Sequence, residues 1–419
     1  MNTEINDHID GERVVPADRI GFAKLITMAF NGVDLMPLQQ SLIAQVVDGT
    51  ADAGVGLDLS LIAQLHGQKQ TGLQMQAEVL GFHRLFRSPC AVPQPKLRVL
   101  ALAAAIDMGG NTPIEFLLEG SEIELTTLYV VPGTDLPSPL PEHDVAIVIA
   151  SDSDECRETL AEIERLAPKW PRPLLNAPRL VRNLDRDKLS RLLRGVEGVD
   201  IPATINVTRA QLAQAAHPVD LLGKDLLVKS ERAPVIVRPR GSHAGVGLAK
   251  IETAAAMADY LAERPEQDFF LSRFVDYSSG DGQFRKYRIV VVDGKPYACH
   301  MAISEQWSIW YLNAGMAFSA TKRLEEAVFM GTFDEGFAVR HQRALAGLIG
   351  RVGLDYFTID CAETKSGDLL IFEVDNTAVV HNMDSPELFP YKAPQMERVF
   401  NAFVRMLYRH GRDEQMCAA

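Results

Sequence analysis

The stretch LLIFEVDN, Leu369 to Asn376, places four apolar residues directly before two carboxylates and an amide. A second apolar stretch, DYFTID (Asp355 to Asp360), precedes it, and residues 365–368 provide a turn between the two. We therefore predict a β-hairpin in which Asp360 lies almost opposite Glu373. Cross-strand neighbours have Cβ atoms about 4.5–5.5 Å apart. Two ionised carboxylates at that distance repel each other, so a purely structural sheet gains nothing from the pair.

A divalent cation would reverse the sign of this interaction. Hard oxygen ligands with room for water and phosphate oxygens suit Mg²⁺, so we predict a magnesium–nucleotide site at the end of the hairpin. Asp375 or Asn376 would add a further oxygen, and the period-2 spacing that puts Asp375 on the face of Glu373 favours Asp375. The alternative is an exposed acidic hairpin edge. The flanking apolar runs disfavour it, because they indicate burial on both faces.

The composition is that of a globular protein of two or three domains. The chain has 419 residues, of which 47% are hydrophobic and 23% charged, and its net charge of −13 argues against broad binding to nucleic acid or anionic membranes. No long apolar run predicts a membrane span, and the polar amino terminus does not resemble a signal peptide. The five scattered cysteines show neither zinc-ligand spacing nor a disulfide framework. We expect a reduced, cytoplasmic compartment.

Three segments differ in their sequence pattern. Residues 1–95 predict a small all-helical domain, whose segment 59–86 resembles one helical hairpin of the tetratricopeptide kind; it is either a cap on the rest of the chain or a surface for a partner. After a proline-rich linker, residues 96–175 alternate buried strands with helices and predict a small parallel α/β domain. Residues 176–410 predict a mixed α+β domain that carries the hairpin. In the second segment, Asn111 lies in a loop after the first strand, where α/β folds bind ligands.

A glycine-rich loop, GSHAGVG (residues 241–247), lies between two apolar strands of the third segment. Glycine lets the backbone approach a phosphate and point its N–H groups at it. This is not a P-loop, since no Gly-Lys-Ser/Thr closes it, and a flexible loop is the alternative. Cationic residues accompany it on a chain of negative net charge and predict an anion site: Arg186, Lys188, Arg238, Arg240, Arg285, Lys286 and Arg288.

Taken in order, these motifs resemble the ATP-grasp superfamily over residues 96–405, on the side of glutathione synthetase, D-alanine–D-alanine ligase and the ribosomal-protein glutamate ligase. RDKL resembles the helix with the first nucleotide-binding lysine, here Lys188, and RKYRIVVV resembles the strand whose arginine faces the transferred phosphate, here Arg288. The two hairpin strands, within residues 355–376, resemble those that hold two Mg²⁺ ions. The chain departs from the family in carrying Arg238 where a lysine is usual, and Glu-Val-Asp-Asn (residues 373–376) where Glu-x-Asn is usual.

The resemblance implies an ATP-dependent ligase that joins a carboxylate to an amine through an acylphosphate and releases ADP and phosphate. It implies ATP and Mg²⁺ as cofactors. The metal ligands would be Asp360, Glu373 and Asp375 or Asn376, and the catalytic residues Arg288, Arg238 and Asn313. ATP would contact Lys188, Arg238, the loop residues Gly241, Ser242, Gly245 and Gly247, and the adenine hinge Arg273, Phe274, Val275 and Asp276.

The acceptor site and the substrates are left open by the sequence. Asn111, His300 and His381 are candidate substrate contacts, although each histidine is equally well explained as a structural residue. The segment 381–392 is a candidate acceptor loop or a surface loop. A peptide docked on the amino-terminal helices and a small metabolite are equally supported as substrates, and relatives of this kind are often dimers or tetramers. The alternatives to a carboxylate–amine ligase are an inactive ATP-binding regulatory protein and a carboxylate kinase or acid–thiol ligase.

Overall fold

The computed structural model describes residues 14–223, 233–242 and 245–417. Contacts divide the chain into two compact units. The amino-terminal unit comprises Met1–Ala150, Glu158–Leu175 and Leu407–Ala419, and the carboxy-terminal unit comprises Ser151–Arg157 and Asn176–Met406. The domain boundary predicted near residue 95 falls inside the amino-terminal unit.

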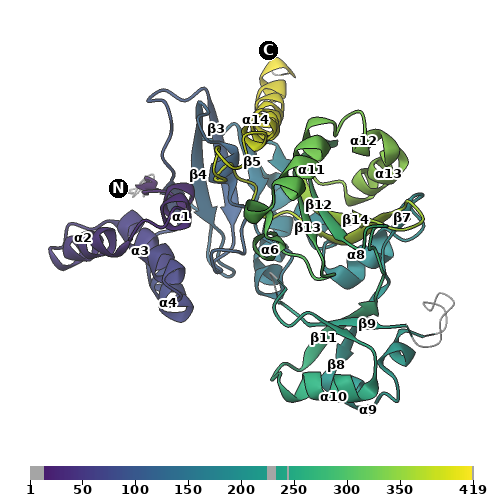
Figure 1. The fold of residues 1–419 in the computed structure, drawn as a ribbon. Helices are drawn as coiled ribbons and strands as arrows, with labels where there is room; N and C mark the ends of the chain where they lie inside the picture. Colours follow the sequence, from purple (N-terminus) through teal and green to yellow (C-terminus); the bar gives the residue numbers. More distant parts are fainter. Residues whose placement is uncertain (1–13, 224–232, 243–244, 418–419) are drawn as a thin grey trace, which may run out of the picture. The chain divides into compact units, whose positions relative to one another are not determined.

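Four helices begin the amino-terminal unit (Figure 1): α1 (Phe22–Phe30), α2 (Met36–Val47), α3 (Ala53–Leu65) and α4 (Lys69–Leu80). Helices α3 and α4 pack closely as the predicted hairpin, because Gly72 carries no side chain: a Cβ there would lie 2.6 Å from the carbonyl oxygen of Ser60. The prediction was wrong at the end of α4. Residues 85–87, expected to be helical, form the strand β2 (Leu85–Arg87), which pairs with a sheet strand. The tetratricopeptide likeness stays a prediction.

The parallel sheet expected after the linker is confirmed. Strands β3 (Leu97–Ala103), β4 (Ile123–Tyr129), β5 (Val145–Val148) and β6 (Leu174–Leu175) run parallel, and β1 (Ala17–Asp18) and β2 extend the sheet in the order β1-β2-β4-β3-β5-β6. Nearly all residues of β3 and β5 are buried, as the continuous apolar runs predict. The helices between the strands are α5 (Ile114–Leu117) and α6 (Arg157–Leu166).

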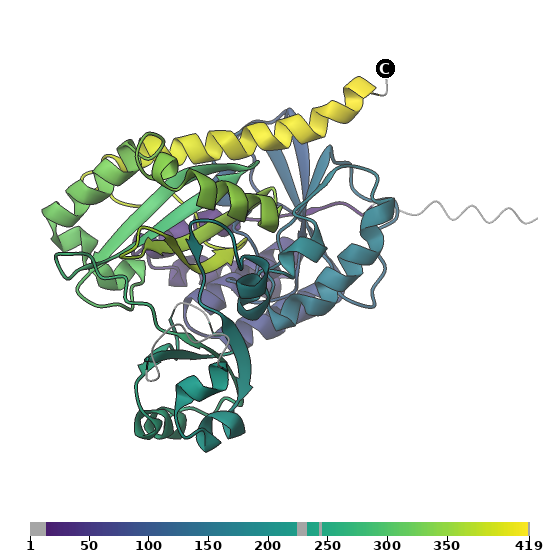
Figure 2. The same ribbon diagram turned by 90° about the vertical axis from the view of Figure 1, so that its right-hand side faces the viewer.

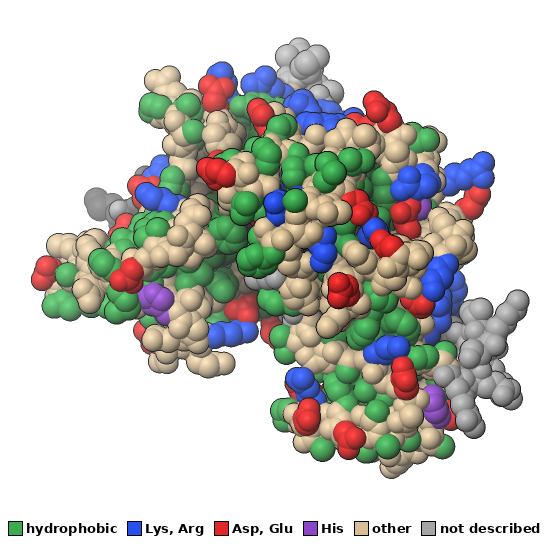
Figure 3. Space-filling view, viewed as in Figure 1, with side chains coloured by type: hydrophobic (Ala, Val, Ile, Leu, Met, Phe, Trp, Pro, Cys, Tyr) green, Lys and Arg blue, Asp and Glu red, His purple; other side chains and the backbone are tan. Residues whose placement is uncertain are grey.

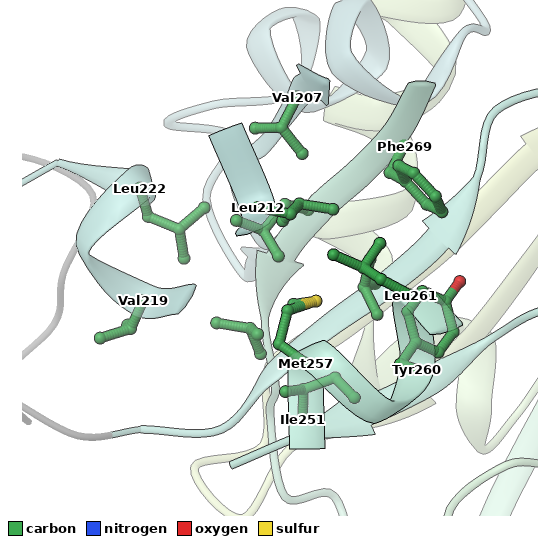
Figure 4. Packing of buried hydrophobic residues seen from close by; sticks show 12 residues of the cluster. Val207, Leu212, Val219, Leu222, Ile251, Met257, Tyr260, Leu261 and Phe269 are labelled. Atoms are coloured by element: carbon green, nitrogen blue, oxygen red, sulfur yellow. The ribbon is translucent and has the colours of Figure 1, made fainter. Parts of the chain in front are cut away.

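The carboxy-terminal unit contains a four-stranded sheet in the order β10-β9-β11-β8. Its strands are β8 (Thr204–Thr208), β9 (Val235–Pro239), β10 (Ala249–Ile251) and β11 (Asp268–Arg273). Helices α9 (Arg209–Gln214) and α10 (Ala254–Ala262) supply apolar side chains to the core on this sheet, among them Leu212, Met257 and Leu261 (Figure 4). Burying each large apolar side chain contributes about 1.5–3 kcal/mol, so this sheet has a core of its own.

The second sheet of this unit has the order β13-β12-β14-β15-β7. Its strands are β12 (Phe284–Val292), β13 (Lys295–Ser304), β14 (Tyr356–Glu363), β15 (Leu369–Asp375) and β7 (Val199–Asp200). The predicted hairpin is confirmed as the antiparallel pair β14–β15. Asp293 and Gly294 join β12 to β13 with φ angles of 53° and 74°, the left-handed conformation that a tight two-residue turn requires.

The remaining helices of the carboxy-terminal unit are α7 (Pro178–Val181), α8 (Arg186–Leu192), α11 (Ala320–Gly331), α12 (Phe337–Arg340), α13 (Gln342–Val352) and the start of α14 (Lys392–Cys417). Helix α14 is the long terminal helix in Figure 2. It belongs to the carboxy-terminal unit up to Met406, and there Phe403 packs edge-on against Tyr356 of β14, with ring centroids 5.1 Å apart. Within the described ranges, every helix is too short or too polar to cross a membrane.

Candidate functional site

The two hairpin carboxylates lie in the predicted register. Asp360 of β14 pairs directly with Glu373 of β15, and Thr358 pairs with Asp375. The ladder is irregular on the other side of this pair, where Cys361 faces Ile371 and Phe372 is the extra residue. Between Glu373 and Asp375 the pairing is regular, so these two carboxylates lie on one face of the strand. The choice of Asp375 over Asn376 as a metal ligand stays a prediction.

Asp360 is held by two cations of the neighbouring strand β12. Arg288 donates from Nε to Oδ1 (2.7 Å) and from Nη2 to Oδ2 (3.0 Å), and Lys286 Nζ lies 2.8 Å from Oδ2. Burial alone would raise the pKa of Asp360, which is 4% exposed, but Arg288 and Lys286 hold that pKa well below its usual value. Asp360 is therefore ionised, and Arg288 is fixed beside it by a two-pronged contact.

Glu373 is paired with Arg186, which the sequence prediction placed in the cationic cluster of the anion site without assigning it a contact with ATP or metal. Arg186, at the start of α8, donates to Glu373 Oε1 (2.6 Å) and to the carbonyl oxygen of Phe372 (3.1 Å). Burial would raise the pKa of Glu373, whereas Arg186 and then Arg238 lower it. The lysine that was predicted from the same helix, Lys188, is exposed and donates to the carbonyl oxygen of Arg182.

Arg238 lies at the base of the glycine-rich loop. It is 9% exposed, and its guanidinium donates to the hydroxyl (3.2 Å) and the carbonyl oxygen of Ser242. Burial, and then the positive charge of Arg186, lower its pKa to about 10. Arginine remains protonated even so. The lowered pKa therefore means that burying this charge is unfavourable, and a bound anion would offset that cost.

The glycines of the loop adopt conformations that other residues disfavour. Gly241, Gly245 and Gly247 have φ angles of 71°, 75° and 69°, and a Cβ on Gly247 would lie 2.5 Å from Pro239 Cδ. Tyr260 of α10 donates to the carbonyl oxygen of Gly247 (2.7 Å) and holds the far end of the loop on the four-stranded sheet. Residues 243 and 244 of the predicted loop lie outside the described residues.

Further carboxylates surround Glu373 and Asp375. Burial and the negative charges of Asp375, Asp185 and Glu373 raise the pKa of Asp152 to about 7. Burial and Glu373 likewise raise the pKa of Asp375. Arg240, next to the glycine loop, ties this region together, since it contacts Asp185 and also Asp154 in the segment that carries Asp152.

The donor chemistry of this region fits a hard cation. Ionised carboxylate oxygens are the ligands that Mg²⁺ prefers, and the raised pKa values of Asp152 and Asp375 report negative charge that a cation would offset. Among the residues described, no group of three or more His, Cys, Asp or Glu side chains already has the arrangement of a metal site. Arginine and lysine contact the carboxylate oxygens of Asp360 and Glu373.

The predicted adenine hinge follows β11. Arg273 pairs with Asp200 (2.5 Å), and the N–H of Phe274 donates to the carbonyl oxygen of Pro234. The ring of Phe274 packs edge-on against Trp307, with centroids 5.7 Å apart, and Lys250 Nζ lies 4.6 Å above it. Val275 packs against the cluster of Tyr277, Ala362 and Leu370. The hinge therefore combines an aromatic surface with backbone groups.

Two predicted site residues are engaged in local contacts in the ligand-free protein. Asp276, predicted to contact ATP at the adenine hinge, forms an ion pair with Lys365 (2.6 Å), and the hydrogen bond from this lysine lowers the pKa of Asp276 to about 2. Asn313 accepts from the N–H of Trp310 and donates to the carbonyl oxygen of Ser308. Its predicted catalytic role needs a change in these contacts.

The histidines predicted to line an acceptor site lie near shared cations. His300 of β13 pairs with Arg288 of β12 in the sheet. Burial, and then Arg288 and Lys392, lower its pKa well below the usual value. Burial is also the main cause that lowers the pKa of His381, and Lys392 and Arg288 act in the same direction. Both imidazoles are therefore neutral at pH 7.

The segment 381–392 ends in a buried polar network rather than on the surface. Lys392, 3% exposed, lies 2.9 Å from an oxygen of Asp384 and 3.4 Å from an oxygen of Glu326. Glu326 also accepts from the hydroxyl of Tyr391 (2.7 Å) and from the N–H of Met301. This network anchors the predicted acceptor loop to α11 and β13. Asn111, the third predicted substrate contact, belongs to the amino-terminal unit. There its side-chain amide accepts from the N–H of Ala104 and donates to the carbonyl oxygen of the same residue.

No family model and no curated protein matches the chain. Among solved structures, a RimK domain protein ATP-grasp from Sphaerobacter thermophilus DSM 20745 is similar at 17% identity and a TM-score of 0.43, over 74% of this chain and 99% of that chain. The D-alanine–D-alanine ligase from Bacillus anthracis complexed with ATP is similar at 12% identity and a TM-score of 0.45, over 76% of this chain and 99% of that chain. The ATP-grasp ligase PsnB, complexed with precursor peptide PsnA2 and AMPPNP, is similar at 13% identity and a TM-score of 0.40, over 75% of this chain and 99% of that chain.

Proposed function

We propose that the protein is an ATP-dependent carboxylate–amine ligase of the ATP-grasp kind. The observation that carries the proposal is that a group of carboxylates and a group of arginines lie close together in the carboxy-terminal unit. Carboxylates end the hairpin β14–β15, and the part-buried guanidiniums of Arg186 and Arg288, from α8 and β12, bond them, while the buried guanidinium of Arg238, from β9, lowers the pKa of Glu373. A phosphate-bearing ligand with a divalent cation complements both sets at once, because its oxygens suit the arginines and its metal suits the carboxylates.

On the phosphate side, Arg238 and Arg186 would bind the terminal phosphates of ATP. The two cations repel each other in the ligand-free protein, and an anion between them removes that cost. The N–H groups of the glycine loop would add neutral donors, since positive φ angles at Gly241, Gly245 and Gly247 let the backbone curl around a ligand. The hinge at Phe274, with its aromatic surface, would receive the base.

On the metal side, Asp360, Glu373 and Asp375 are the proposed ligands. Bound Mg²⁺ would neutralise charge on the phosphates during transfer. The arginine that now bonds Glu373 would exchange part of that contact for phosphate, and Arg288 would exchange part of its contact with Asp360. This exchange keeps every charged group paired before and after binding.

In the proposed reaction a carboxylate oxygen of the acid attacks the γ-phosphorus of ATP, and the bond to the β-phosphate oxygen breaks, which gives an acylphosphate and ADP. The neutral amine then attacks the acyl carbon, and phosphate leaves with the carboxylate oxygen that it received. Arg288 would stabilise the negative charge of the acylphosphate and of the tetrahedral intermediate. Neither step needs a nucleophilic side chain.

The substrates remain those weighed from the sequence, a peptide or a small metabolite. The helices of the amino-terminal unit present apolar side chains to solvent over α2 and its neighbouring turns (Figure 3): Phe30, Val33, Met36, Ile43, Val46 and Val47 are each 45–79% exposed. Such a surface supports peptide docking or self-association. We propose a reduced compartment as well, in keeping with the absence of disulfides at the described cysteines, Cys90, Cys156, Cys299 and Cys361.

Glu373→Gln tests the proposal against the rival of an inactive ATP-binding protein. The change keeps the side chain's shape and removes the metal-facing charge, so we expect turnover of Mg·ATP with an acid–amine pair to fall at least 100-fold. Asp368→Asn, at the turn end of the same hairpin, is the matched control and should turn over normally. Equal turnover by the two variants would contradict the metal assignment. ATP binding without turnover in any acid–amine pool would favour the inactive protein.

A further inference from the structure

A cavity in the amino-terminal unit is lined by residues that have no role in the proposed ATP and metal sites; one of them, Asn111, is a predicted substrate contact. It has a volume of about 70 Å³ and lies between the helical hairpin α3–α4 and the carboxyl ends of the parallel strands β3 and β4. Ligands bind at this edge of α/β sheets. At roughly 10–15 Å³ for each water-sized group, the cavity has room for about five to seven non-hydrogen atoms. All of its lining residues belong to this one unit.

The walls of the cavity are fixed by buried hydrogen bonds. Gln64 of α3 accepts from the N–H of Met108 (2.9 Å), and Gln76 of α4 donates to the carbonyl oxygen of Ile106 (3.1 Å). Both glutamines are 7% exposed. These two bonds hold the loop that follows β3 against the helices, so the cavity is preformed rather than assembled by a ligand.

Several buried polar groups that line the cavity keep hydrogen-bonding capacity in reserve. Gln64 uses its carbonyl oxygen on Met108, which leaves its NH₂ group, and Gln76 uses its NH₂ group on Ile106, which leaves its carbonyl oxygen. Among the described residues, none takes the hydroxyl hydrogen of Tyr129, whose side chain is 8% exposed. A ligand in the cavity can bond these groups.

The charges at the cavity specify a zwitterion. Arg19 contacts Asp58 through Nε and Nη2 (2.9 Å each), and its other N–H groups remain to bind an anion. Among the described residues, the donors to Glu115 are two neutral groups, the N–H of Ala23 and the hydroxyl of Ser88. Burial, Glu115 and Asp58 raise the pKa of Tyr129, so its hydroxyl stays protonated and can donate. Donors for a carboxylate and an acceptor for an ammonium thus line one small cavity.

We propose that this cavity binds a small α-amino acid of the size of alanine. Its carboxylate would accept from Arg19, Tyr129 and the NH₂ group of Gln64. Its ammonium would donate to Glu115 and to the carbonyl oxygen of Gln76. The short side chain would lie against Leu57, Leu61 and Ile114, which are 2–4% exposed. The small volume, about 70 Å³, favours such a short side chain.

Calorimetric titration of the full chain with alanine tests the proposal, with propionate, ethylamine and phenylalanine as comparisons. We expect saturable binding of alanine alone. Tyr129→Phe should weaken it about tenfold through the lost donor. Gln64→Glu should abolish it, because this near-isosteric change keeps the acceptor for Met108 and places a negative charge beside the ligand's carboxylate. Tyr297→Phe, on β13 of the other unit, is the matched control and should bind as the unaltered chain does.

Three results would overturn the proposal. One is the absence of saturable binding of alanine, which would mean that the cavity holds water only. Another is equal binding of propionate or ethylamine, which would remove the zwitterion assignment. The last is alanine binding that persists unchanged in Tyr129→Phe and Gln64→Glu, which would place the ligand elsewhere, including at the proposed ligase site. None of the residues changed here belongs to that site, so failure of one proposal leaves the other standing.

Discussion

Replacing Arg238 by methionine should strengthen the ligand-free protein or leave its stability unchanged, while it weakens ATP binding. The guanidinium of Arg238 is 9% exposed, and burial and Arg186 lower its pKa to about 10, against an ordinary value above 12. At about 1.4 kcal/mol for each pKa unit, holding the charge there costs on the order of 3 kcal/mol. Methionine removes the charge and fills similar space.

The loss of two hydrogen bonds to Ser242 offsets part of this gain, at about 1–1.5 kcal/mol each. The net change in the free energy of unfolding is therefore expected between about 0 and +1 kcal/mol. ATP binding loses a charge-assisted contact worth about 1.5–3 kcal/mol, so its dissociation constant should rise about 10- to 100-fold. Urea unfolding followed by tryptophan emission, and calorimetric titration with Mg·ATP, measure the two quantities.

Arg209→Met is the matched control, since Arg209 also lies in the four-stranded sheet region but has a structural role. It donates to the carbonyl oxygens of Leu261, Arg264 and Glu266. We expect its loss to lower the free energy of unfolding by about 2–4 kcal/mol and to leave ATP affinity unchanged. The reasoning is refuted if Arg238→Met behaves like this control, with a destabilised fold and an ATP affinity within about twofold of the unaltered chain.

Two further predictions concern stability. Burial would raise the pKa of Glu363, but hydrogen bonds from His341 and Arg340 lower it to about 2. The ionised Glu363 therefore stabilises the fold fully above about pH 4.3, the ordinary pKa of glutamate. This contribution to the free energy of unfolding is lost as the pH falls toward 2. After allowance for the partial exposure of Glu363, this contribution amounts to about 1–2 kcal/mol. The midpoints of urea unfolding at pH 6 and at pH 3 should therefore differ less in Glu363→Gln than in the unaltered chain. Gly72→Val should lower the free energy of unfolding by about 1–3 kcal/mol, since a Cβ there would lie 2.6 Å from the carbonyl oxygen of Ser60. A Cβ at Gly350 in α13 meets nothing within 4 Å, so Gly350→Ala should be neutral or stabilising. Equal urea midpoints for these two variants would contradict the close packing of α3 on α4.

The hairpin at the centre of the candidate site could be predicted because its information is local. Turn residues fix the pairing register, and alternation along each strand fixes which side chains share a face. Asp360 opposite Glu373 follows from counting residues on either side of the turn, and the structure has that pair in register. The parallel sheet of the amino-terminal unit was predictable for a similar reason, since buried strands read as continuous apolar runs.

Residues that enter the site through long-range packing were not predictable in the same way. Arg186 and Lys188 lie on the same short helix, and only the packing of α8 against β15 selects Arg186, which is 187 positions from Glu373 in the chain. Lys392 and Glu326 form their buried pair across 66 residues by the same kind of packing. The strand at residues 85–87 was misread because its side chains also suit a helix, and pairing with β4 decided the outcome.

The central claim is tested most directly by following one carboxylate oxygen. The full chain is incubated with Mg·ATP and pools of ¹⁸O-labelled acids and amines, and ADP, phosphate and the label in phosphate are measured together. A carboxylate–amine ligase predicts ADP and phosphate in equal amounts, formed only with a matching pair, with one labelled oxygen in each phosphate. Phosphate that forms without a matching pair and carries no label from the acid, or the release of AMP in place of ADP, would contradict the account.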